Sequence, residues 1–166
     1  MTIERTRYVF DDSLWPLHIT VTPNVASLEE IQRFMTMMEA VYARKQKFLA
    51  VAFVPGVLRQ DRQTIKRYGE WMRDTRESVR LYSMGTVFIT PSMLFRFVLS
   101  GLFLIQPLES PHEIVADIDA AVPWIASTLR SHGMPVPSRL AERLRPFAPE
   151  IRSAGPALDP TKTSSP

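Results

Sequence analysis

Four polar residues with a chemistry suited to anions follow two short apolar runs of the chain. Arg59 and Arg62 follow the first run, and Ser92 and Arg96 follow the second. Ligands of open α/β sheets bind at the carboxyl ends of the strands, where the N-termini of the next helices favour negative charge. If the two runs are neighbouring strands, the four side chains line one positively charged crevice. The alternative is that they are solvated side chains in a chain with 16 arginines and 4 lysines.

The remaining polar residues predict neither catalysis nor cofactor binding. The chain has no cysteine, which excludes thiolate metal sites and cysteine nucleophiles, and its glycines form no phosphate-binding loop. The three histidines, His18, His112 and His132, are scattered, and His18 lies on the polar face of an alternating segment, where we expect it to be solvated. Acidic residues fall in turns, in first turns of helices or among arginines, which favours structural roles. We therefore expect no catalytic residue, no cofactor and no metal.

Composition indicates one α/β domain in the cytoplasm. The chain has 166 residues, of which 45% are hydrophobic, and a net charge of +3, so one core is feasible. Lysines and arginines form no long run, which argues against nucleic-acid binding. The most apolar stretch, residues 93–105, contains Arg96 and is shorter than the roughly 20 residues that span a bilayer. The N-terminus lacks the pattern of a signal peptide.

Hydrophobic periodicity predicts strands alternating with helices. Residues 8–10 and the alternating segment 17–21 predict a starting β-hairpin, and Ser27 with Glu30 marks the first helix as a capping box. The run 48–54 is apolar throughout, as is typical of a central parallel strand. The later elements are expected as a helix over 61–81, a strand over 86–90, a helix from Thr90 to Leu102, a short strand over 113–116 and a last helix capped by Asp119 or, second choice, Asp117.

This order predicts a mixed sheet of four to five strands with an N-terminal hairpin, covered by about four helices. The helix beginning at Thr90, with Pro91 at its first position, is apolar nearly all round. Such a helix is either buried on most sides or presents an apolar stripe to a partner. From residue 134 onward proline is frequent and periodicity is lost, so we expect a domain of residues 1–133 and a mostly disordered tail of residues 134–166. A brief helix over 138–145 is the one exception.

The element order, the run 48–54, the helix over 61–81 and the closing pattern of Asp117, Ala121 and Trp124 resemble the STAS-like superfamily. This superfamily holds anti-sigma-factor antagonists and the cytoplasmic domains of sulfate transporters, and the likeness is to its one-domain bacterial type. The resemblance implies a mixed sheet with packed helices that works by docking to other proteins. Antagonists of that family carry a phosphorylatable serine between a central strand and the second helix. Residues 55–62 contain no serine, which argues against a phosphoserine switch.

Two function classes follow from the sequence. The first is a non-enzymatic regulatory or scaffolding module that binds a protein through the second and third helices and the loops before them. The alternative is a small-molecule or anion-binding domain that uses the crevice of Arg59, Arg62 and Arg96, with Ser92 beside them. The sequence specifies no oligomeric state.

Overall fold

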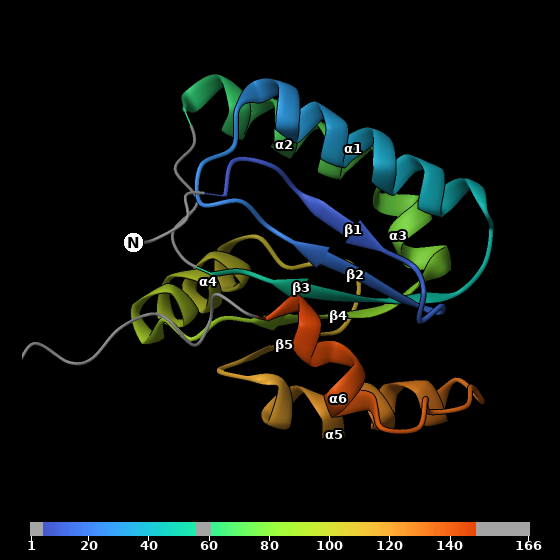
Figure 1. Cartoon of the computed structure of the whole chain (residues 1–166). Helices are drawn as coiled ribbons and strands as arrows, with labels where there is room; N and C mark the ends of the chain where they lie inside the picture. Colours follow the sequence, from blue (N-terminus) through green and yellow to red (C-terminus); the bar gives the residue numbers. More distant parts are fainter. Residues whose placement is uncertain (1–4, 56–60, 149–166) are drawn as a thin grey trace, which may run out of the picture.

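A computed structural model describes residues 5–55 and 61–148 of the chain, and it contains one five-stranded sheet (Figure 1). The strands lie side by side in chain order. β1 runs antiparallel to β2, and β2 to β5 are parallel to one another. The strands are β1 (Val9–Asp11), β2 (Leu17–Val21), β3 (Phe48–Phe53), β4 (Ser83–Ile89) and β5 (His112–Val115). The prediction of an α/β fold with a mixed sheet and an N-terminal hairpin is confirmed.

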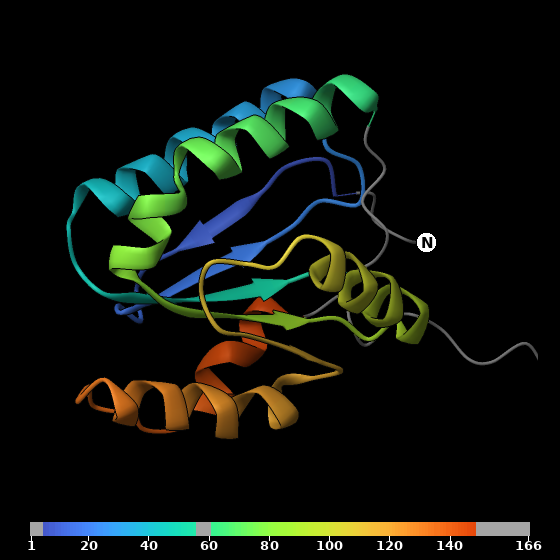
Figure 2. The ribbon, with the colours of Figure 1, turned by 180° about the vertical axis from the view of Figure 1, so that it is seen from behind.

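Six α-helices in the described residues lie around this sheet: α1 (Leu28–Ala43), α2 (Arg62–Asp74), α3 (Arg76–Tyr82), α4 (Met93–Ile105), α5 (Ile118–Ser131) and α6 (Leu140–Leu144), with a 3-10 turn η1 (Arg145–Phe147) at the end. Helices α1, α2 and α3 cover one face, and α5 and α6 cover the other (Figures 1 and 2). The predicted helix over 61–81 is two helices, because the chain breaks at Thr75, whose hydroxyl bonds back to the Trp71 carbonyl at 2.8 Å.

The core consists of two layers, one on each face of the sheet. Side chains of β3 alternate between them, as a strand buried on both faces requires. Leu49, Val51 and Phe53 belong to the layer under α5 and α6, whereas Phe48 belongs to the layer under α1. All of these side chains are at most 1% exposed. The run of apolar residues therefore forms the central parallel strand that it predicts.

Two helix starts are shifted by contacts that sequence alone does not show. Thr90, the residue after β4, donates its N–H to the Val115 carbonyl of β5 at 2.9 Å, and Ser92 caps α4 instead. The last helix is capped by Asp117, which accepts from Ala120 N at 2.8 Å, and the preferred cap Asp119 lies in its first turn. Pro123 consequently lies inside α5.

The first helix begins as expected, but its acidic residue has another role. Ser27 accepts a hydrogen bond from Glu30 N at 3.1 Å, which is the cap. The Glu30 carboxylate instead accepts from Tyr8 N at 3.0 Å and from Arg33 Nε at 3.2 Å. Burial raises the pKa of Glu30, but hydrogen bonds from Arg33 and Tyr8 outweigh this and leave the pKa below its usual value. Glu30 thus ties the entry of β1 to α1.

Residues 134–148 belong to the fold, so the expected domain boundary at residue 133 lies too early. Leu140 and Leu144, one turn apart on α6, are 4% and 0% exposed in the core layer under α5. Phe147 follows, and its ring stacks on Phe53 with centroids 6.4 Å apart. The burial of these apolar side chains offsets the conformational entropy that a proline-rich segment loses when it becomes ordered. Residues 149–166, the rest of the expected tail, lie outside the described residues.

Candidate interaction surface

Of the four residues predicted to form a site, the structure describes three. Arg59 lies outside the described residues. Arg62 is the first residue of α2 and is exposed, while Ser92 and Arg96 lie together at the start of α4. The strands before them, β3 and β4, are parallel neighbours, so their carboxyl ends lie at the same end of the sheet.

Ser92 and Arg96 use their polar atoms to build the start of α4. The Ser92 hydroxyl accepts from Phe95 N at 3.1 Å. The Arg96 guanidinium folds back and donates to the carbonyls of Thr90 at 2.8 Å and Pro91 at 3.2 Å. These contacts hold the helix against the end of β4, which is a structural role for both side chains.

Helix α4 itself carries the most unusual surface in the described residues. It lies beside the edge where the parallel strands end, apart from the helix layers on the two faces (Figures 1 and 2). None of its residues is buried. Seven large apolar side chains on it are 50% to 86% exposed: Met93, Leu94, Phe97, Val98, Leu102, Leu104 and Ile105. We call this set the α4 face.

The inner side of α4 makes the contacts with the sheet. Phe103 packs against Phe88 of β4 with ring centroids 5.3 Å apart, and against His112 of β5 at 4.7 Å. Phe95 and Leu99 share this side of the helix and are partly buried. Phe88 is half-buried, with Phe103 of α4 packed on its ring.

The α4 face contains no charged side chain. Arg96 is the one charged residue between Met93 and Ile105, and its guanidinium is turned back to the loop before the helix. Gly101 lies among the exposed side chains, and a Cβ added there would meet no atom within 4 Å beyond the adjacent residues and backbone of α4 itself. Monomeric proteins rarely leave an apolar patch of this extent in water, so such a patch marks an interaction site. No helix in the described residues, α4 included, is long and apolar enough to cross a membrane.

His18 is buried, not solvated as its strand position suggested. It is 1% exposed, and its Nδ1 lies 2.5 Å from Oδ1 of Asp12, whose other oxygen pairs with Arg44. The Arg44 guanidinium also lies over the Trp15 ring, 4.5 Å from its centroid. Burial raises the pKa of Asp12, but hydrogen bonds from His18 and Arg44 more than reverse this and hold the pKa below its usual value. The cluster joins the β1–β2 turn to the end of α1.

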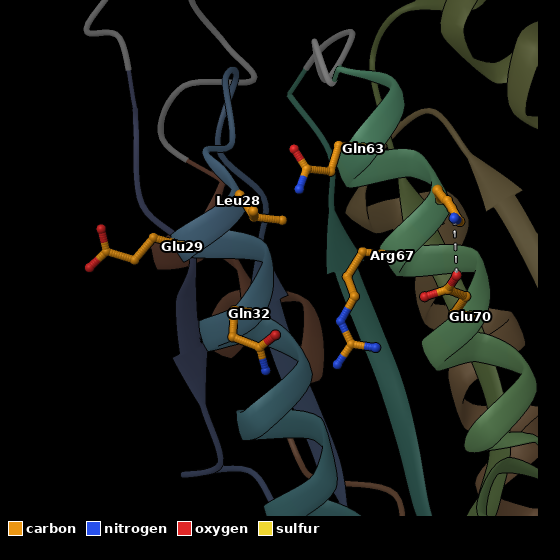
Figure 3. Close-up of a pocket in the computed structure, with 7 residues that line it drawn as sticks. Leu28, Glu29, Gln32, Gln63, Arg67 and Glu70 are labelled. Atoms are coloured by element: carbon orange, nitrogen blue, oxygen red, sulfur yellow. Dashed lines mark ion pairs between the residues drawn. The ribbon is translucent and has the colours of Figure 1, made fainter.

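An open groove of about 560 Å³ lies between the first turns of α1 and α2 (Figure 3). Gln32 of α1 and Arg67 of α2 lie in the space between the two helices, and Lys66 pairs with Glu70 at 3.9 Å on α2. Glu29 adds a second acid, so the lining carries two charges of each sign. This balance favours neither an anion nor a cation. In the residues that the structure describes, no three histidine or acidic side chains gather as metal ligands would.

No family model, no curated protein and no solved structure matches this chain. The candidate interaction surface is therefore argued from the structure of this chain, in which the α4 face is the strongest candidate. The sequence left open whether the helix beginning at Thr90 is buried or presents an apolar stripe. In the structure it presents a broad exposed apolar face.

Proposed function

We propose that the chain is a non-enzymatic docking module that binds protein through the α4 face. The observation that carries this proposal is the exposure of seven large apolar side chains on one helix with no charge among them. Burial of apolar surface contributes roughly 25 cal/mol per Å². Binding of a partner that covers α4 is therefore favoured by burial of apolar surface that is exposed to water in the isolated chain.

The polar groups of the protein support a binding role over a catalytic one. Asp12, His18 and Glu30 make buried or half-buried contacts that hold elements together. Ser92 and Arg96 cap and brace α4. The anion-binding alternative needs Arg96 to face a ligand, whereas Arg96 donates to two backbone carbonyls. Docking needs only the α4 face.

The resemblance to STAS-like proteins agrees with this proposal, because members of that superfamily work by docking. A regulatory or scaffolding role, a cytoplasmic location and the STAS-like assignment itself are parts of the proposal that rest on the sequence. The mixed sheet, with its starting hairpin and helices on both faces, is compatible with them.

Photo-cross-linking in cells tests the docking function. A photoreactive amino acid replaces Phe97, which is 77% exposed on α4. The control carries the same group at Ser127, an exposed position on α5, which covers one face of the sheet. We expect protein adducts of defined mass from position 97 and none of the same mass from position 127. Equal adduct patterns from both positions, or no protein adduct from position 97, would contradict the proposal.

A further inference from the structure

The exposed side of α4 has the spacing of a helix-pairing seam. Leu94, Val98, Gly101 and Ile105 are separated by four, three and four residues, which places them in one row along the helix. Leu94 and Ile105 are 70% and 86% exposed, and Val98 is 54% exposed. The row thus has large side chains at its ends, and valine and glycine at its centre.

We infer that this seam pairs with the same seam of a second copy, so that the chain forms an antiparallel two-fold dimer through α4. The inference rests on the docking function proposed above and names its partner. In this arrangement Leu94 of each copy faces Ile105 of the other. Val98 of each copy faces Gly101 of the other, where open space around the glycine lets the helices approach.

The size of the α4 face fits a dimer interface. The seven exposed side chains together offer on the order of 900 Å² of apolar surface, against roughly 800 Å² that each partner gives to a standard interface. An isologous interface brings each surface against itself, so any charge near its axis would meet its own copy. The α4 face has no charge, so two copies meet without repulsion.

The antiparallel direction follows from side-chain size. A parallel pair would place Gly101 opposite Gly101 and leave a gap, whereas the antiparallel pair matches valine with glycine. Interdigitation of large and small side chains gives the packing density of protein interiors. The antiparallel pair also sets the two helix dipoles in opposite directions.

A lipid surface fits this helix less well than a second copy. Interfacial helices carry lysine and arginine on the side that faces the headgroups, and anionic lipids repel acidic side chains. Helix α4 packs on β5, which contains the exposed Glu113, and the exposed Asp117 follows that strand. The one arginine of α4 is engaged by backbone carbonyls.

Sedimentation of the purified full chain over a concentration series tests the dimer. We expect a dimer for the wild type, and at least about thirtyfold weaker association, the loss of one interface hot spot, for both Val98→Glu and Gly101→Leu. The second variant adds apolar surface where the monomer has room, so it removes only the close packing. The control, Ile65→Glu, changes an apolar side chain on α2 that is 57% exposed and should leave the dimer intact.

Cysteine cross-linking tests the direction, because the chain has no cysteine of its own. In the antiparallel pair, two copies of residue 94 lie roughly 16 Å apart along the axes, beyond the roughly 7 Å that a disulfide spans. Leu94→Cys mixed with Ile105→Cys should therefore form a disulfide dimer, and neither variant should do so alone. Cross-linking of Leu94→Cys alone would overturn the arrangement.

The remaining outcomes separate the two proposals. A wild type that stays monomeric or forms larger oligomers overturns the dimer. A Gly101→Leu variant that still dimerises overturns the packing of the dimer on the α4 seam. If position 97 still yields adducts with a different protein in cells, the docking function stands and its partner is not a second copy. If anionic vesicles bind the wild type and Gly101→Leu alike, and only Val98→Glu abolishes binding, the face serves lipid and the dimer is overturned. If cells yield no protein adduct, the docking function fails as well.

Discussion

His18 illustrates how tertiary contacts decide the environment of a single residue. Alternation along β2 assigns it to a polar face, which in a sheet covered on one side faces water. Here α1 covers that face, so His18 lies between Phe10 and Phe48 with ring centroids 6.2 Å from each. Asp12 then supplies a hydrogen-bond partner for one nitrogen of the buried imidazole, Nδ1. Sequence alone cannot give this, since Asp12 is contributed by a turn.

The Asp12 cluster predicts an acid-dependent loss of stability. Because the folded pKa of Asp12 lies below its ordinary value of 3.8, its contribution is full above that value and is lost as pH falls through the folded pKa. Asp12→Asn should lower the free energy of unfolding at pH 7 by about 1–3 kcal/mol. The decline of the melting temperature between pH 5 and pH 2.5 should also become shallower.

Asp119→Asn is the control for this change. It removes the same charge from the exposed first turn of α5, where a carboxylate contributes a few tenths of a kcal/mol. Thermal melts across the pH range compare the three proteins. An identical pH profile for wild type and Asp12→Asn would show that the cluster contributes nothing to folding.

At the scale of elements, periodicity predicts the strands and the first helix well, and its failures have local causes. The segment 61–81 keeps a helical pattern through Thr75, so the break between α2 and α3 is not visible in it. The brief helix expected over 138–145 is present as α6, but the prolines around it predicted a tail outside the core, whereas Leu140 and Leu144 are core residues. The sequence does not indicate that α4 is exposed, because an apolar helix has the same hydrophobic pattern whether it packs on a sheet or faces solvent.

Helix α6 should contribute strongly to stability. Leu144 is fully buried, so Leu144→Ala should lower the free energy of unfolding by about 2–5 kcal/mol, the cost of a core cavity. Removal of residues 134–166 should cost at least as much, because it takes both core leucines of α6 away. Chemical denaturation measures both.

Arg143→Ala serves as the comparison, since Arg143 is exposed on the same helix. It should change stability by no more than about 0.5 kcal/mol. If Leu144→Ala and Arg143→Ala behaved alike, α6 would not be part of the core.

At the scale of the whole molecule, the fold class was predictable and the functional surface was predictable only in part. Alternation of apolar strands with amphipathic helices implies the mixed sheet and its hairpin. The proposed arginine site required the arginine side chains to point into one crevice at the carboxyl ends of the strands. Arg96 instead points toward backbone carbonyls. The α4 face depends on the position of α4, the helix that connects β4 to β5. Packing of Phe103 on Phe88 fixes that position.

The central claim, that the α4 face is covered by protein in its native setting, is tested most directly by solvent protection at position 97. Since the chain has no cysteine, Phe97→Cys and Ser127→Cys each carry a single thiol. In concentrated native extract the thiol at position 97 should react with a maleimide at least about tenfold more slowly than the one at position 127, which corresponds to about 1.4 kcal/mol of protection. After purification and dilution the two rates should converge. Equal rates in the extract would contradict the account.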